Sequence, residues 1–178
     1  MYWLSSSTIA RLRDQLRTQG MRPSIIPSGP MSPTEMMDEQ VRSEWAGLVE
    51  AMYIMMSSDG DVSDAETDVL RGAIRALSDD GVRSAQLNAM LAEAKERVDA
   101  HGAKKRLQDV TREIREDRAK AEVTFVLASA VAFADDAIFD QENELVTELA
   151  ELLAIDEARA NELLDAVEQD LAAAKAAG

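Results

Sequence analysis

Apolar residues recur at three- and four-residue spacing along most of the chain, which is the spacing of one face of an α-helix. No segment alternates between apolar and polar residues with the β-branched enrichment that is typical of a strand. The pattern predicts helices over residues 34–56, 63–77, 84–101, from 104 to a break near 116–119, 123–134, 140–153 and 156–175. The segment 123–134 is apolar on every face and is the expected central helix. We therefore predict an all-α protein of about seven helices.

Short polar motifs mark several of the expected helix ends. Ser32-Pro33-Thr34-Glu35 and Ser63-Asp64-Ala65-Glu66 both have the form of a capping box, in which the serine and the glutamate bond to each other's backbone N–H. Asp79-Asp80-Gly81 is expected to stop one helix, and Ser84 is expected to cap the next. His101-Gly102 indicates a further break.

All four prolines fall between residues 23 and 33, which predicts a loop or linker there. We accordingly divide the chain into an N-terminal arm with a Pro-rich linker, residues 1–33, and a helical domain, residues 34–178. Within the arm, Ser7–Thr18 has the pattern of a short basic amphipathic helix, with Ile9, Leu12 and Leu16 on one side. This segment is interpreted as an arm that frays or packs on the domain. The alternative is a segment that docks on a membrane surface or on a partner.

The chain is strongly acidic: 34 Asp and Glu against 19 Lys and Arg give a net charge of −15. Such a charge disfavours contact with phosphate backbones, so we expect no nucleic-acid partner. Residues 95–120 are locally basic, and they are interpreted as a solvated helix face rather than an RNA or partner site. There is no apolar run long enough to span a bilayer and no pattern of a secretory signal, which predicts a cytoplasmic protein without a transmembrane segment.

Two segments of the chain repeat each other, at residues 55–66 and 131–142. Asp59 matches Asp135, Asp64 matches Asp140, and Glu66 matches Glu142, with an apolar residue between them in each copy. Each copy therefore predicts an apolar helix, a tight acidic turn and a second helix. Because one such unit cannot bury its apolar face alone, the two units are expected to pack together in a pseudo-symmetric arrangement.

The carboxylates of these turns have two interpretations. Helix capping explains an acidic residue at the start of a helix, since it satisfies free backbone N–H groups and complements the helix dipole. Alternatively, the oxygen ligands hold a hard divalent cation such as Ca²⁺, Mg²⁺ or Mn²⁺. The spacing is not that of an EF-hand, so contributions from both turns are expected to matter more than either turn alone. The candidate ligands are Asp59, Asp61, Glu66, Asp135, Asp136, Asp140 and Glu142.

The paired turns resemble those of the TerB-like family of tellurite-resistance proteins, over roughly residues 44–167. The segment Glu151-Leu152-Leu153-Ala154-Ile155-Asp156 is also similar to the family's turn before its last helix. The resemblance implies an all-helical domain and a role in bacterial stress response. It also implies metal binding at the acidic positions that match Asp59, Glu66, Asp135 and Glu142. Two residues depart from the family pattern: Asp136 stands in place of a glycine, and Phe139 in place of a capping polar residue.

An enzyme is not expected. The chain has no cysteine, one histidine (His101) and no glycine-rich phosphate loop, which removes most nucleophiles, bases and nucleotide sites. Two functions remain. The first is a non-enzymatic stress-response domain that binds a divalent cation through its acidic turns. The alternative is a metal-independent interaction module whose acidic surface recruits a protein partner that is basic or membrane-associated.

Overall fold

The computed structural model describes residues 4–18, 33–60, 62–133 and 140–177. These residues contain eight α-helices and no strand, which confirms the all-α prediction and its approximate number of helices. The helices are α1 (Ser6–Thr18), α2 (Pro33–Met56), α3 (Asp64–Leu77), α4 (Ser84–His101), α5 (Ala103–Ile114), α6 (Arg118–Ala132), α7 (Asp140–Leu152) and α8 (Glu157–Ala177). A short 3₁₀ helix, η1 (Ser57–Asp59), follows α2.

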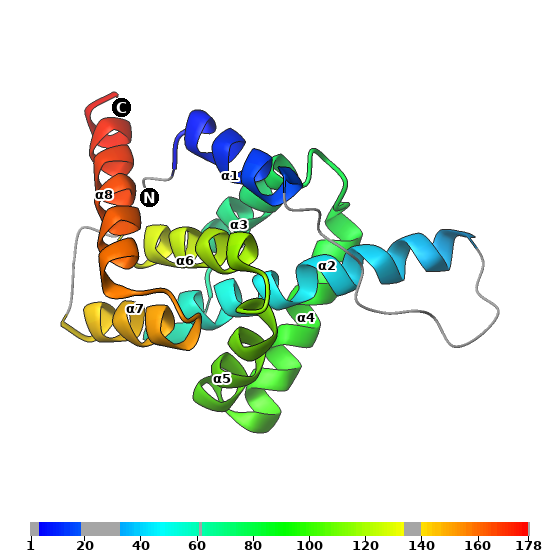
Figure 1. Cartoon of the computed structure of the whole chain (residues 1–178). Coiled ribbons are helices and arrows are strands. Elements are labelled where there is room, and N and C mark those ends of the chain that lie inside the picture. Colours follow the sequence, from blue (N-terminus) through cyan, green and yellow to red (C-terminus); the bar gives the residue numbers. More distant parts are fainter. Residues whose placement is uncertain (1–3, 19–32, 61, 134–139, 178) are drawn as a thin grey trace.

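Two apolar helices, α2 and α6, form the centre of the molecule. The second half of α2 is buried from Leu48 to Met56 except for Tyr53, and α6 is buried from Ala119 to Ala130 except for Lys120. The two helices contact each other and run in the same direction across the molecule (Figure 1). Burying this much apolar surface between them is the main favourable contribution to the fold. The segment expected to be the central helix therefore occupies that place.

The remaining helices cover this pair from several sides (Figure 1). Helices α4 and α5 contact α2, while α7 and α8 contact α6. Helix α1 contacts both α3 and α6. Its apolar stripe is buried there, so within the described residues the N-terminal helix packs on the bundle. The Pro-rich segment between α1 and α2 lies outside the described residues.

Most predicted helix ends agree with the structure. The chain turns after α3 with positive φ angles at Asp79 (54°) and Asp80 (59°), and Gly102 (84°) separates α4 from α5. The break between α5 and α6 also lies close to its expected place. The predicted cap at Ser84 is wrong. Ser84 is the first residue of α4, and the capping position belongs to Arg83, whose backbone N–H donates to the Gln86 side chain at 2.8 Å.

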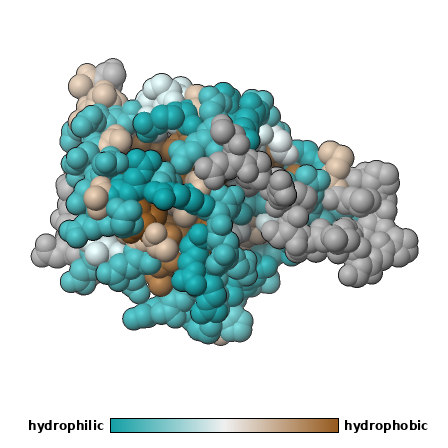
Figure 2. Space-filling model, viewed as in Figure 1, coloured by the Kyte–Doolittle hydropathy of each residue, from teal (hydrophilic) through white to brown (hydrophobic). Residues whose placement is uncertain are grey.

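Hydrophilic side chains cover most of the face shown in Figure 2, and a small hydrophobic area appears beside α7. Over the described part of the chain, no helix is both long enough and apolar enough to cross a membrane. One large apolar side chain is strongly exposed among these residues, Met37 near the start of α2.

Candidate functional site

The first acidic turn follows directly from the buried end of α2. After Met56 the chain tightens into η1, and the backbone N–H of Gly60 donates to the carbonyl of Ser57 at 3.3 Å. Gly60 has a φ of 147°, a backbone angle that residues with a Cβ rarely adopt. The turn therefore depends on glycine here.

The end of this turn is fixed by the capping box expected from the sequence. The backbone N–H of Glu66 donates to Ser63 Oγ at 3.2 Å, and the backbone N–H of Ser63 donates to Glu66 Oε2 at 2.6 Å. These two bonds satisfy otherwise free N–H groups at the start of α3. The capping interpretation is thus confirmed for Glu66, and the bond also holds its carboxylate in a defined orientation.

The structure describes the side chain of only one of the seven candidate metal ligands, Glu66. Asp59 belongs to η1, while Asp140 and Glu142 belong to the first turn of α7, but their side chains lie outside the description. Asp61, Asp135 and Asp136 lie outside the described residues altogether. Within the part that is described, no three acidic or histidine side chains are grouped closely enough to hold a metal ion.

The helices that lead into the two acidic segments are neighbours. Helices α2 and α6 pack together, and their C-terminal ends lie on the same side of the molecule (Figure 1). The next helices along the chain, α3 and α7, run in different directions (Figure 1). Sequence reasoning expected two units of this kind, each made of an apolar helix and a second helix beginning near a glutamate.

A buried carboxylate on α2 was not anticipated from the sequence. Glu50 is 2% exposed and lies among the apolar residues of the helix. Arg106 of α5 donates to it through Nε (2.6 Å) and Nη2 (3.0 Å), and Arg97 of α4 donates through Nη1 (3.0 Å). The hydrogen bond from Arg106 to Glu50 raises the pKa of the guanidinium. This ion cluster links three helices, and it shows that part of the basic segment 95–120 faces inward. The interpretation of that segment as a purely solvated face is wrong for Arg106.

Helix α6 carries a second buried carboxylate, Glu122, which is 5% exposed. Arg159 of α8 donates to both of its oxygens, at 3.0 and 2.7 Å, and Arg118 and Gln15 donate at 3.3 and 3.1 Å. These donors stabilise the charged form, and the hydrogen bonds from Arg159 are the main reason why the pKa of Glu122 lies below its ordinary value. In the sequence, each of the two residues stands out as a single glutamate within an otherwise apolar run. Nothing in the sequence indicates which residues are their partners.

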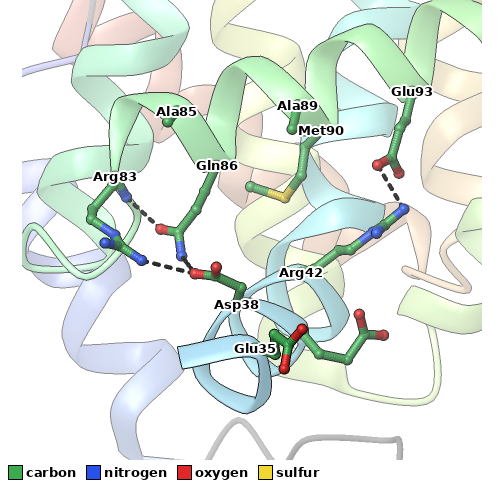
Figure 3. A pocket seen from close by; sticks show the side chains of 10 residues that line it. Glu35, Asp38, Arg42, Arg83, Ala85, Gln86, Ala89, Met90 and Glu93 are labelled. Carbon is green, nitrogen blue, oxygen red and sulfur yellow. Dashed lines mark hydrogen bonds and ion pairs between the residues drawn. The ribbon is translucent and has the colours of Figure 1, made fainter. Parts of the chain in front are cut away.

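Two clefts with charged residues in their lining flank α2. The first, of about 560 Å³, lies between the start of α2 and α4 (Figure 3). Two pairs of its charges are engaged with each other: Asp38 accepts from Arg83 at 2.8 Å, and Arg42 lies 2.6 Å from Glu93. The second cleft, of about 730 Å³, lies beside the Glu50 cluster and is also lined by Lys120, whose pKa is lowered by burial. Lys120 donates to the carbonyl of Glu44 at 2.6 Å.

Comparison with known families identifies the domain. A family model described as "Tellurite resistance protein TerB" matches residues 46–165. The chain therefore belongs to the TerB family, and the resemblance seen in the sequence is confirmed. No curated protein and no solved structure matches the chain. The matched region begins within α2 and ends within α8, so α1 lies outside it.

Proposed function

We propose that this chain is a non-enzymatic stress-response domain of the tellurite-resistance type, which binds a divalent cation through carboxylates of both acidic turns. The observation that carries the proposal is the packing of α2 against α6 in the same direction. Because the two acidic segments follow helix ends that lie on the same side of the molecule, carboxylates from both copies can contribute to one site. A cation with oxygen ligands would offset the mutual repulsion of such carboxylates.

The geometry around Glu66 supports a ligand role. Its Oε2 atom accepts the capping bond from Ser63, and a carboxylate keeps further lone pairs for a cation. The capping bond restrains the side chain, which lowers the entropic cost of binding. The other ligands of the proposed site are Asp59, Asp61, Asp135, Asp136, Asp140 and Glu142.

The two buried carboxylates favour a structural role over catalysis. A general acid needs a raised pKa, whereas the pKa of Glu122 is lowered by its arginine partners. Glu50 is likewise engaged by Arg97 and Arg106. Both glutamates hold helices together through their arginine partners. This supports a non-enzymatic role. The cytoplasmic location stays a prediction.

Calorimetry with Ca²⁺, Mg²⁺ and Mn²⁺ tests the cation proposal. We expect binding tighter than millimolar for the wild-type chain and at least tenfold weaker binding for an Asp59→Asn/Asp135→Asn double variant. Asp165→Asn/Glu168→Gln is the matched control, since these exposed residues of α8 remove the same charge away from the turns. Wild-type binding no tighter than millimolar would contradict the proposal, and so would equal losses in the two double variants.

The alternative is a metal-independent interaction module that recruits a basic partner. It is supported by a row of exposed acidic residues on α8, namely Glu157, Glu162, Asp165 and Glu168. Binding through such a surface weakens in high salt and survives a chelator, because exposed charges are screened by ions. Partners captured from a lysate only in the presence of a divalent cation would argue against this alternative.

A further inference from the structure

Helix α1 is seated on the bundle along a mainly apolar stripe. Leu4, Ile9, Leu12 and Leu16 are between 2 and 6% exposed, and the helix contacts α3 and α6. The last three follow the i, i+3, i+7 spacing of an amphipathic helix bound in a groove. The surface of the bundle beneath α1 is therefore a helix-binding groove, and α1 is its occupant in this structure.

The edges of this groove are acidic. Arg17 of α1 donates to Asp79 at 2.8 Å, and Arg13 lies 3.6 Å from the same carboxylate. Gln15 donates to Glu122 at 3.1 Å. At the other end of the helix, the backbone N–H of Ser5 donates to Asp170 Oδ2 at 2.7 Å. These contacts run from donors of residues 5–17 to carboxylates in the turn after α3, on α6 and on α8. The two arginines both meet Asp79, so the groove favours a helix that carries basic residues at this end.

The fit between α1 and α3 is incomplete. A hollow of about 410 Å³ remains between them, lined on the α3 side by residues that include Val69, Gly72 and Ala76. Arg13 Nε is buried there with no hydrogen bond, and its nearest acceptor is Asp14 Oδ1 at 3.5 Å, so Arg13 is held by long ion pairs only. A partner helix with a bulkier apolar side chain facing Val69, Gly72 and Ala76 would fill this hollow, which α1 leaves open.

We propose that the groove between α3, α6 and α8 binds a basic amphipathic helix of a partner protein, and that α1 is an intramolecular competitor for it. Helix α1 lies outside residues 46–165, the region matched by the family model, whereas α3, α6 and the start of α8 lie within it. Because α1 is covalently attached, it occupies the groove at a high effective concentration. A partner helix binds by displacing it. This surface is distinct from the acidic turns, and its occupation requires no cation.

The test uses a fluorescent peptide of residues 4–18 as the probe and measures fluorescence anisotropy in the presence of a chelator. Leu12→Asp in the full chain places a charge on the buried face of α1 and releases it. We expect the L12D chain to bind the peptide at least tenfold more tightly than the wild-type chain, whose groove is occupied. Arg11→Asp, on the exposed face of α1, is the control and is expected to behave as wild type. A peptide carrying the L12D substitution is expected not to bind.

Hydrogen–deuterium exchange of the wild-type chain gives a second measurement that does not depend on the variant. Excess isotope-labelled peptide should accelerate exchange in residues 6–18 severalfold and leave α2 unchanged. A folded L12D chain that fails to bind the peptide would overturn the proposal. If the L12D chain does not fold, unchanged exchange of α1 at millimolar peptide would overturn it instead. Both assays are run in the presence of a chelator, so their failure would leave cation binding at the acidic turns unaffected.

Discussion

Replacing the buried carboxylate of Glu50 by an amide, Glu50→Gln, should strongly destabilise the protein. Glu50 is 2% exposed and accepts three charge-assisted hydrogen bonds, at 2.6, 3.0 and 3.0 Å, from Arg106 and Arg97. Glutamine keeps the shape but removes the negative charge, so two guanidinium groups lose their common partner. Breaking a fully buried ion pair costs about 3–5 kcal/mol.

The exposure of the arginines reduces this figure. The side chains of Arg97 and Arg106 are 38% and 20% exposed, so both recover part of their hydration when the carboxylate is lost. The amide oxygen of glutamine also keeps one acceptor. We therefore expect the free energy of unfolding to fall by about 2–4 kcal/mol, within the range for loss of a buried ionic network.

Urea denaturation followed by circular dichroism at 222 nm measures this loss. Glu96→Gln, at an exposed position on the same helix as Arg97, is the matched control and should change stability by less than about 0.5 kcal/mol. Combining Glu50→Gln with Arg106→Gln should cost clearly less than the sum of the single substitutions, because the two residues share one interaction. A loss below about 0.5 kcal/mol for Glu50→Gln would refute the reasoning.

Three further predictions follow from local geometry. The folded-state pKa of Glu122 lies below its ordinary value of 4.5, so its contribution to stability is present above that pH and is lost as the pH falls through the folded pKa. In an Arg159→Gln variant, the free energy of unfolding should therefore fall less between neutral and acid pH than it does in the wild type. Gly60→Ala should destabilise the chain by about 1 kcal/mol in urea denaturation because of its positive φ, whereas Gly72→Ala, in helix α3 with open space around the new Cβ, should stabilise it by up to about 1 kcal/mol. Ser63→Ala removes the capping box of α3 and should cost about 1 kcal/mol, measured by the shift in the urea midpoint, and a cost near zero would contradict the capping role.

The sequence predicted features that depend on neighbouring residues. The capping box at Ser63 and Glu66 is set within a few residues, and the apolar segment 123–134 could be assigned to the centre because all its faces are apolar. Contacts between distant residues were not predictable. Glu50 meets Arg97 and Arg106 only because α4 and α5 pack against α2, and spacing along the chain carries no information about that packing.

The same limit applies to the candidate site. Sequence alignment of the two repeats identified the acidic positions, and the structure adds that the helices leading into them are neighbours. The packing of α1 on α3 could be predicted only in part. The apolar stripe of α1 indicates that the helix packs on the domain, but it does not indicate which helices it contacts. The prediction at Ser84 was wrong because serine is also common in the first turn of a helix. Ser84 occupies that turn, and Arg83 is the capping residue.

Paramagnetic broadening by Mn²⁺ tests the central claim, that carboxylates of both acidic turns hold one divalent cation. Mn²⁺ is titrated at substoichiometric amounts into the uniformly ¹⁵N-labelled chain, and the backbone amide signals are followed by NMR. We predict that amides of residues 57–66 and 131–142 broaden together, before those of any other segment. Broadening that begins along the acidic surface of α8, or in one of the two turns alone, would contradict the claim.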